Sequence, residues 1–365
     1  MSYADLEPYL TEMEQIMAIS GPEGGPWDRQ WPYPLPPHRC SPADELLKKA
    51  HGKLHIEVPC ARASRPTMQR TRCFSNNVCS ICPVDAKFNL FNGMMAPFED
   101  PRVSVMLEAD VTAVDIQAGV ARGVTYTKEG VEHQVAADMV IRAAHGFQNP
   151  YLLKRSGYDN DLVGRHLHGE LSFFGEIMLD GVEHFGGSSI LTCYNYSHYD
   201  GDFRSERGSL FIEHHNQGRL RIEKGRWRQV IPIMGKIEET PLPENRVIVS
   251  DQNPSKPTVV MEHHSEYAMR TYRMAKSLLE KTYASLPVED IVVHRTNDFT
   301  AHIYGTTIMG KDPATSVVDG DMLLHDVRNL MVLGSSCFPS GGHNNPTITL
   351  SALAMRSADR LTGNA

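Results

Sequence analysis

The sequence predicts a mixed fold, part α/β and part α+β, in which a β-meander and a large antiparallel sheet are flanked by helices. Short Val-rich runs broken by glycine fill residues 103–144 and are typical of a β-meander. Apolar and polar residues alternate in several pieces of residues 170–262, which indicates an antiparallel sheet. Residues 265–286 have the clearest helical pattern, because five positions can share one face: Ala268, Tyr272, Ala275, Leu279 and Leu286.

The N-terminal region is predicted to contain two helices separated by an irregular excursion. Residues 1–17 form an apolar pattern at helical spacing, and Pro8 is expected in the first turn, where proline is tolerated. Gly21–Pro37, "GPEGGPWDRQWPYPLPP", is too rich in proline and glycine for regular structure and is expected to form a long surface excursion or lid. Residues 43–54 are predicted to be helical again.

The meander is expected to end in a buried strand-like run at residues 140–144, and a short helix is expected to begin after the Asn149–Pro150 break. The chain closes with a strand in "NLMVLGSS", a Gly-rich loop, and a helix from about Thr347 to Leu361. The first turn of that helix offers unpaired N–H groups and the positive end of a dipole. It would suit an anion or the electron-rich edge of a reduced cofactor.

Composition and charge exclude several classes of protein. The formal net charge is −8 and no Lys/Arg run forms a basic patch, which argues against a nucleic-acid partner. No apolar stretch reaches 18 residues, so no membrane span is predicted. The first residues carry Asp and Glu where a secretory signal would be basic and apolar. We therefore expect a cytoplasmic protein, with periplasmic export of a folded complex with a partner as the alternative.

Three of the 7 cysteines lie within the stretch Cys73–Pro83, "CFSNNVCSICP", with the spacing C-x5-C-x2-C-P. Thiolates suit iron, and a Cys-Pro ending also occurs in ferredoxin-type sequences. The alternative is a loop of reduced packing cysteines, and zinc is weaker because a fourth ligand is not evident nearby. The remaining cysteines are expected to be packing residues. The pairs His214–His215 and His263–His264 are not predicted metal sites, because adjacent residues on a strand face opposite sides.

Two C-terminal segments carry the most specific motifs, "AHIYGTTIMGKDPATSVVD" (301–319) and "NLMVLGSSCFPSGGHNNPTITLSALAMRSADRL" (329–361). Their pattern of His-x-x-Gly-Thr-x-x-Met-Gly, then Val-Val-Asp, then a strand and an Asn-Pro-Thr helix start resembles the glucose-methanol-choline (GMC) family of flavoprotein oxidoreductases. The upstream pieces "PYPLPP", "ADVTAV", "VIRAAHG" and "LVGRHLHGE" also resemble that family. The likeness extends over nearly the whole chain.

The resemblance implies hydride transfer from an alcohol to FAD. It implies that His302 takes the hydroxyl proton, a role that suits histidine because its ordinary pKa lies near the operating pH. Asn345 would hydrogen-bond the substrate oxygen, although it could also cap the last helix. His343 is expected to be a loop residue rather than a catalyst. The residues implied to contact FAD are Val111, Ala144, Gly334, Ser335, Asn345, Pro346 and Thr347.

Two features depart from the family pattern. His145 stands where the family usually has the glycine of Ala-Ala-Gly, and no part of the chain matches the strand–GxGxxG–helix signature of a dinucleotide-binding fold. We therefore expect a GMC-type fold that lacks the N-terminal nucleotide-binding portion. A second polypeptide would supply that portion and share the FAD. The alternatives are a non-catalytic carbohydrate-binding or stabilising partner subunit, and an N-terminal portion absent from this sequence.

Within the family, the chain resembles bacterial sugar dehydrogenases of the glucose, fructose and gluconate type. Their loop C-x-x-N-N-x-C-x3-C-P holds a [3Fe–4S] cluster, which implies Cys73, Cys79 and Cys82 as ligands here, although the last interval is one residue shorter. The resemblance thus implies a subunit of a split dehydrogenase that oxidises a hydroxyl of a sugar, polyol or glycoside. Its electrons would pass, through the cluster if it is present, to an acceptor protein or a quinone.

The resemblance also implies a domain organisation. Residues 1–50 are expected to form the N-terminal helix and lid segment, and residues 51–168 a partial FAD domain with the cysteine loop and the meander. Residues 169–295 would form the substrate domain with the large antiparallel sheet. Residues 296–365 would return to the FAD domain and carry the catalytic motifs.

Overall fold

The structure is a computed structural model of residues 1–365, and it describes residues 1–75, 79, 81–188, 190–297 and 302–363. The described helices are α1 (Tyr3–Ile16), α2 (Pro42–His51), α3 (Leu90–Gly93), α4 (Ala96–Glu99), α5 (His145–Arg155), α6 (Glu266–Arg273), α7 (Ala275–Thr282) and α8 (Thr347–Thr362). The strands are β1 (His55–Glu57), β2 (Asp110–Gln117), β3 (Val120–Lys128), β4 (Val131–Ala136), β5 (Val140–Arg142), β6 (Leu171–Leu179), β7 (Leu191–His198), β8 (Leu210–His215), β9 (Val230–Ile237), β10 (Arg246–Ser250), β11 (Asn253–Val260), β12 (Val288–Asn297) and β13 (Leu330–Val332).

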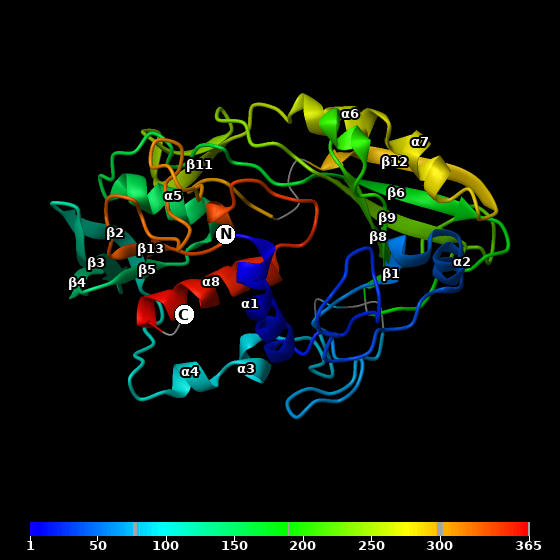
Figure 1. The fold of residues 1–365 in the computed structure, drawn as a ribbon, viewed down its shortest axis with the longest axis horizontal. Coiled ribbons are helices and arrows are strands. Elements are labelled where there is room, and N and C mark those ends of the chain that lie inside the picture. Colours follow the sequence, from blue (N-terminus) through cyan, green and yellow to red (C-terminus); the bar gives the residue numbers. More distant parts are fainter. Residues whose placement is uncertain (76–78, 80, 189, 298–301, 364–365) are drawn as a thin grey trace.

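A six-stranded antiparallel sheet occupies one end of the molecule (Figure 1). Its strand order is β1-β7-β8-β9-β6-β12. The alternating pattern of β6 sends Leu171, Phe173 and Ile177 into a core shared with α6 and α7. The predicted large antiparallel sheet is therefore confirmed. The alternating stretch of residues 170–262 does not coincide with the sheet, because β1 and β12 also join it and β10–β11 form a separate hairpin.

The helix predicted over residues 265–286 is two helices, α6 and α7, that meet at Met274. Ser265 begins α6 by accepting the Ala268 N–H at 3.2 Å. The Met274 N–H bonds to the carbonyl groups of Thr271 and Tyr272 instead of the carbonyl four residues back. This tightened turn changes the direction of the chain, so the apolar residues of both helices reach the curved sheet.

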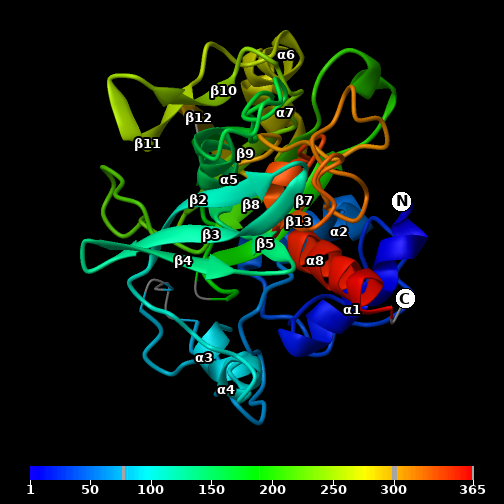
Figure 2. The same ribbon diagram turned by 90° about the vertical axis from the view of Figure 1, so that its left-hand side faces the viewer.

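The other end of the molecule holds two smaller sheets, shown face on in Figure 2. Strands β2, β3 and β4 form the predicted antiparallel meander. Strand β5 does not continue the meander but pairs with β13 in parallel. Asn329 joins the two sheets, since its amide donates to the carbonyl groups of Ala121 (2.7 Å) and Asp138 (2.9 Å). Helices α1 and α8 pack against each other beside this region (Figure 1).

Two helix predictions need correction because proline lies inside a helix. Pro8 lies beyond the first turn of α1, which Ser2 and Asp5 cap reciprocally. Helix α5 begins at His145, not after the Asn149–Pro150 break, and includes Pro150. Proline cannot donate to the carbonyl four residues earlier. In α5 that carbonyl belongs to Gly146, and it accepts the Thr306 hydroxyl at 2.6 Å instead. A residue 160 positions away thus makes the helix possible.

No helix in the described part of the chain has the length and apolar character that a membrane crossing requires. The segment predicted as a lid, Gly21–Pro37, is anchored at its start because Ser20 bridges to Leu35 and Cys60. Within the segment, Arg29 donates to Glu14 of α1 at 3.1 Å, and its guanidinium lies 3.7 Å from the centre of the Tyr33 ring. These contacts hold the segment against α1.

Candidate active site

His302 is paired with a buried carboxylate that precedes β6. Its Nδ1 lies 2.9 Å and 3.0 Å from the two carboxylate oxygens of Glu170, and the Tyr304 hydroxyl donates to the same carboxylate at 3.1 Å. An ionised carboxylate only accepts hydrogen bonds, so Nδ1 of a neutral His302 carries the proton and Nε2 keeps its lone pair. Burial and the nearby Glu170 charge raise the pKa of Tyr304, so its hydroxyl stays a donor.

Asn345 is held by a buried charged pair on the large sheet. Its Oδ1 accepts from Lys236 Nζ at 2.7 Å, and its Nδ2 donates to Glu213 at 3.0 Å and to the Tyr194 hydroxyl at 3.2 Å. Lys236 and Glu213 form an ion pair at 3.0 Å, and both side chains are buried. Asn345 therefore does not cap α8, because Pro346 occupies the N-cap position and no side chain bonds there.

Tyr304 connects the surroundings of the two predicted catalytic residues. It lines a cavity of 440 Å³ together with Asn345 and Gly342, and its hydroxyl shares Glu170 with His302. His343 is buried nearby, with Nδ1 2.8 Å from the Ser209 hydroxyl. Burial lowers its pKa to about 4, so the ring is neutral.

The residues that sequence reasoning missed come from distant strands. Glu170 immediately precedes β6, Glu213 lies on β8 and Lys236 on β9. The available sequence signal is weak, since each is a charged residue inside or beside an otherwise apolar strand pattern. Charged side chains are almost never fully buried unless they are paired, so such positions warrant a search for a partner.

Three of the predicted cofactor residues lie at the carboxyl ends of the parallel strands β5 and β13. Asn149 joins these ends: its Oδ1 accepts the Ala144 N–H at 3.0 Å, and its Nδ2 donates to the Leu333 carbonyl at 3.0 Å. Gly334 follows directly, and the Ser335 hydroxyl donates to the Ile303 carbonyl at 2.7 Å, next to His302. Ligands of open parallel sheets bind at this edge.

The surface at these residues is open to a ligand. Gly334 has φ +114°, and a Cβ atom placed there would meet nothing within 4 Å. Ala144 and Thr347 are exposed, and the first intrahelical bond of α8 runs from Leu350 N–H to the Pro346 carbonyl at 3.0 Å. The earlier N–H groups are not used by the helix, as a site for an electron-rich group requires. Val111 is exposed on β2, and its contact with FAD stays a prediction.

His145 keeps the backbone conformation that a glycine would have at this position. Its φ is +78°, a left-handed value that Asn, Asp and His adopt more often than other side chains do. Its ring is exposed and lies edge-on to Phe147, with ring centres 5.3 Å apart. The departure from the family glycine therefore leaves the turn into α5 intact and adds a side chain on its outer surface.

Each predicted metal-ligating cysteine accepts an N–H group. The Cys79 sulfur accepts from Arg62 Nε at 3.0 Å, the Cys82 sulfur from Ala86 N–H at 3.2 Å and the Cys73 sulfur from Ser75 N–H at 3.4 Å. Burial raises the pKa of Cys82, but backbone N–H groups outweigh it and lower that pKa overall. Asn76 and Asn77, which share the motif, lie outside the described residues.

The cysteine loop lies close to the start of α8. Arg62, which contacts Cys79, lines a cavity of 550 Å³ together with Asn345 and Thr347. Among the described residues, the sulfurs of Cys73, Cys79 and Cys82 do not form a group in which all three potential ligand atoms lie within 4.8 Å of one another. The cysteine ligands of an iron–sulfur cluster bind different iron atoms, so a cluster does not need so tight a group.

The chain resembles known proteins of one family over most of its length. Two GMC oxidoreductase family profiles match residues 1–172 and 241–354. The fructose dehydrogenase large subunit of Gluconobacter japonicus is 28% identical over 409 residues, which cover 99% of this chain and 74% of that protein. Paromamine 6'-oxidase of Streptomyces fradiae is 26% identical (99% and 71% covered), and the gluconate 2-dehydrogenase flavoprotein of Pantoea cypripedii is 24% identical (98% and 71% covered).

The fold is also found among solved structures. Pyridoxine 4-oxidase from Mesorbium loti superimposes with a TM-score of 0.62 at 14% identity, over 95% of this chain and 72% of that one. The two family profiles, N-terminal and then C-terminal, together match most of the chain. Both His302 and Asn345 lie within the second match. The chain is a member of the GMC oxidoreductase family, whose members use FAD.

Proposed function

We propose that this chain is the substrate-oxidising subunit of an FAD-dependent dehydrogenase that acts on a hydroxyl of a sugar, polyol or glycoside. The observation that carries the proposal is the His302–Glu170 pair, which presents a histidine nitrogen with a free lone pair beside the predicted flavin edge. The relatives named for fructose, gluconate and paromamine support a carbohydrate hydroxyl as the group oxidised.

His302 would act as the base. Nε2 would accept the hydroxyl proton, while the Nδ1–H bond to Glu170 fixes the ring and stabilises the imidazolium that forms, as a carboxylate does in other carboxylate–histidine pairs. Tyr304 keeps the Glu170 carboxylate in place. When bound, FAD supplies the acceptor for the hydride that leaves the substrate carbon.

Asn345 would orient the substrate oxygen. Its Oδ1 is fixed by Lys236 and one Nδ2 hydrogen is used by Glu213, while the longest of its bonds, 3.2 Å, goes to the Tyr194 hydroxyl. A substrate oxygen that replaced Tyr194 as acceptor would receive that second Nδ2 hydrogen. The buried Lys236–Glu213 pair thus sets the direction in which the amide can donate.

A cavity of 560 Å³ between α1, the segment Gly21–Pro37 and the start of α8 would bind the part of the substrate beyond the reacting hydroxyl, since Asn345 lines it and His302 does not. Its lining combines aromatic rings, which pack against the C–H faces of sugars, with charged groups that bind hydroxyls. The lining includes Trp27, Trp31, Tyr33, Glu14, Arg29 and Asn345.

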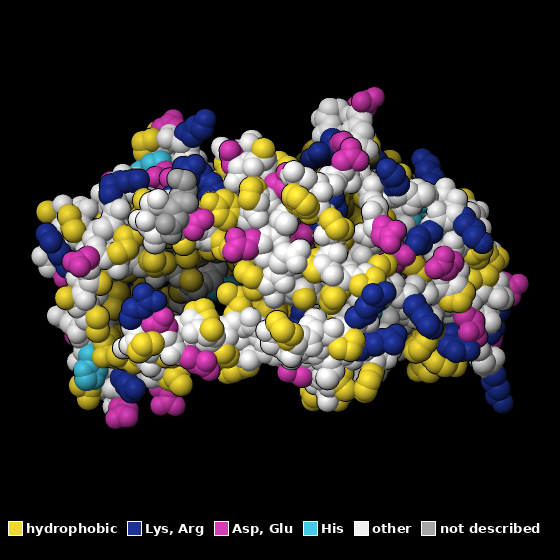
Figure 3. Space-filling view, turned by 60° about the horizontal axis from the view of Figure 1, so that its bottom comes forward, with side chains coloured by type: hydrophobic (Ala, Val, Ile, Leu, Met, Phe, Trp, Pro, Cys, Tyr) yellow, Lys and Arg dark blue, Asp and Glu magenta, His cyan; other side chains and the backbone are white. Residues whose placement is uncertain are grey.

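A second polypeptide that carries the GxGxxG motif would share the FAD with this chain. In the described residues β5 and β13 pair only with each other, whereas parallel sheets are usually larger and covered on both faces. Several large apolar side chains are exposed in the stretch from residue 90 to the end of β5: Leu90, Phe91, Phe98, Val105, Leu107, Val111 and Ile141. On the left of Figure 3, hydrophobic side chains surround a hollow in the surface. The name of the fructose dehydrogenase relative, a large subunit, also supports a heteromer.

Cys73, Cys79 and Cys82 would hold a [3Fe–4S] cluster. Their N–H···S contacts are the kind that adjust the potential of such clusters, and Arg62 joins the loop to the cavity beside Asn345 and Thr347. A cluster there would supply one-electron transfer towards an acceptor protein or quinone, which makes the enzyme a dehydrogenase rather than an oxidase.

The test is to co-express the chain with the product of the neighbouring gene and to measure flavin absorbance and dye reduction with fructose, gluconate and glycosides. Flavin bands and turnover in the complex support the proposal, and turnover should be lost in His302→Gln but kept in the control His263→Gln, an exposed histidine. A complex that holds flavin but reduces no dye with any hydroxyl substrate would favour the non-catalytic partner subunit.

A further inference from the structure

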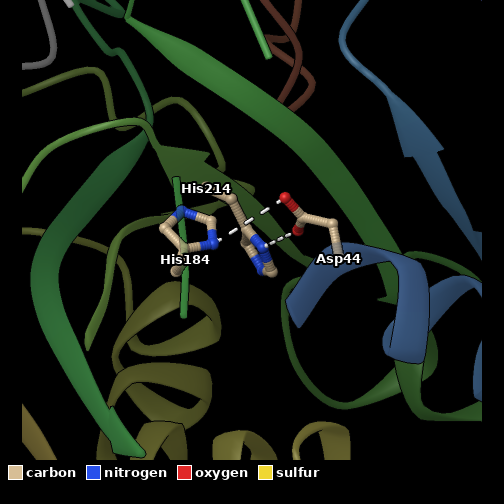
Figure 4. A group of neighbouring side chains, drawn as sticks. All are labelled: Asp44, His184 and His214. Carbon is tan, nitrogen blue, oxygen red and sulfur yellow. Dashed lines mark hydrogen bonds and ion pairs between the residues drawn. The ribbon is translucent and has the colours of Figure 1, made fainter. Parts of the chain in front are cut away.

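A second cluster of titratable side chains lies outside the active site, beneath α2. Figure 4 shows Asp44 of α2, His184 from the loop after β6 and His214 of β8 pointing towards one another. All three side chains are fully buried. Each residue offers one potential metal-ligand atom, and these three atoms all lie within 4.8 Å of one another. Elements that are 140 and 170 residues apart in sequence thus meet at one point.

The tautomer of His184 is determined by its outer nitrogen. His184 Nε2 lies 3.1 Å from the His215 carbonyl oxygen, which can only accept, so Nε2 of a neutral ring carries the proton. The Nδ1 lone pair then points inward, 2.9 Å from the Ser41 hydroxyl and 3.8 Å from Asp44 Oδ2.

The Ser41 hydroxyl cannot donate to both of its acceptors. Its hydroxyl lies 2.7 Å from Asp44 Oδ2 and 2.9 Å from His184 Nδ1, and a hydroxyl has one hydrogen to donate. If this hydrogen goes to His184 Nδ1, Asp44 Oδ2 keeps only the long bond from the Ser41 N–H at 3.4 Å. If it goes to Asp44 Oδ2, His184 Nδ1 receives no hydrogen from Ser41, and an unmet buried acceptor costs free energy. A cation bound between the two acceptors removes this conflict.

His214 has the same orientation as His184. Its Nδ1 faces Asp44 Oδ1 at 2.7 Å, and its Nε2 faces the Tyr283 hydroxyl at 2.7 Å. Both histidines thus direct Nδ1 inward and Nε2 towards an oxygen outside the cluster. Without a metal, the Asp44 carboxylate only accepts, so neutral His214 donates from Nδ1 to Asp44 and accepts the Tyr283 hydroxyl at Nε2. A metal at Nδ1 would displace that proton, and the Tyr283 oxygen would then accept from Nε2–H, as second groups do at metal-binding histidines.

His55 has a different role. Its Nε2 lies 3.1 Å from Asp44 Oδ1, and its Nδ1 lies 3.1 Å from Asn195 Nδ2, which donates to it. Both nitrogens are thus satisfied without a cation, and the ring holds the Asp44 carboxylate in place. Cys193 lies on the same side of Asp44, with its sulfur 3.1 Å from that of Cys40.

We propose that Asp44, His184 and His214 bind a structural Zn²⁺ ion, with the Ser41 hydroxyl oxygen or a water as the fourth ligand. Zinc binds imidazole nitrogen and carboxylate oxygen at about 2.0–2.2 Å, so two ligands of one ion lie up to about 4 Å apart. Asp44 Oδ1 lies 2.7 Å from His214 Nδ1, and Asp44 Oδ2 lies 3.8 Å from His184 Nδ1. Shifts of less than about 1 Å would bring these atoms to the zinc geometry. The ion would join α2 to β8 of the large sheet.

The histidine pair His214–His215 remains a poor joint site, as the sequence pattern predicts. The His215 ring lies on the opposite side of β8, 6.4 Å from the Phe174 ring. His215 contributes its backbone carbonyl to the site, and its side chain provides a matched control for His214.

The experiment measures metal content in the purified chain and does not depend on FAD, on a partner or on activity. The chain is produced in zinc-supplemented medium and analysed by mass spectrometry for zinc, with iron measured separately. We expect about one zinc per chain. Zinc should fall to background in Asp44→Asn and His184→Gln, and it should stay at the wild-type level in His215→Gln.

A second measurement uses the wild-type chain, so it tests the site even where the variants do not fold. Wild-type chain freed of zinc by a chelator and loaded with Co²⁺ should show the visible bands of a four-coordinate site, and the chelator should lower its melting temperature reversibly. Wild-type chain that contains no zinc above background, and whose melting temperature Zn²⁺ does not raise, would overturn the proposal. Zinc retained in His184→Gln would overturn the ligand assignment.

Discussion

The Nδ1 atom of His302 lies 2.9 Å from Oε1 and 3.0 Å from Oε2 of Glu170. The two residues are 132 positions apart, and the carboxylate is buried. This pair gives the proposed base His302 a defined tautomer in its neutral form. It also provides the most direct test of the proposed chemistry.

Replacing Glu170 by Gln should lower kcat by about a hundredfold, within the range that general-base groups contribute. The amide cannot stabilise the imidazolium, and its NH₂ group can turn the ring to the wrong tautomer. KM should change little, because Glu170 does not line the proposed substrate cavity. Steady-state dye-reduction kinetics of the assembled enzyme give both constants. Glu266→Gln on exposed α6 is the control, and equal kcat in the two variants would remove Glu170 from the mechanism.

The Lys236–Glu213 pair should stabilise the fold only as a complete pair. Lys236→Met leaves Glu213 buried without its cation, which should cost about 3–5 kcal/mol in the free energy of unfolding. The double variant Lys236→Met/Glu213→Leu should recover most of this loss, because apolar pairs often replace buried ion pairs well. Its turnover should stay low, since Asn345 loses two of its three partners and keeps only the Tyr194 hydroxyl. Urea unfolding measures the stabilities, and a single variant as stable as wild type would contradict the buried pair.

His343 should make the fold sensitive to acid. Burial lowers its pKa to about 4, whereas histidine ordinarily titrates near 6.5. The stability contributed by the neutral ring is thus fully present above pH 6.5 and is lost as the pH falls towards 4, because the unfolded chain binds the proton first. The loss is on the order of 3 kcal/mol.

The unfolding free energy of His343→Gln should therefore fall less steeply than that of wild type between pH 6.5 and 4. Urea titrations at several pH values give the slope. The exposed His263 is the control, since His263→Gln should keep the wild-type slope. Identical slopes for wild type and His343→Gln would show that this ring is not the source of acid sensitivity.

Substitution of the loop cysteines should remove iron from the assembled enzyme. Cys82→Ser and Cys79→Ser each delete a predicted ligand, whereas Cys337→Ser alters a buried thiol whose pKa burial raises to about 11. Iron analysis and electron paramagnetic resonance should show a cluster in wild type and Cys337→Ser and none in the loop variants. Wild-type complex with no iron after anaerobic purification would mean that the loop holds no cluster.

Local patterns were sufficient to predict the meander, the central part of the large sheet, and the last strand and helix. In β6, for example, alternation places Leu171, Phe173 and Ile177 on one face, and this period follows from the backbone itself. The linked motifs around His302 and Asn345 likewise identified the family, since they are short and contiguous. Where local patterns failed, a distant contact decided: Thr306 satisfies the Gly146 carbonyl and lets α5 run through Pro150.

The sequence by itself determined the family, the candidate base and the class of fold, because these depend on spacing and periodicity within short segments. Only the tertiary structure decided how that base is held. Glu170 approaches His302, and Lys236 approaches Asn345 across 109 residues. It also decided which of the histidines gather around Asp44. The physical reason is that a buried charge or lone pair is stable only beside its partner, and no local pattern records which distant residue that partner is.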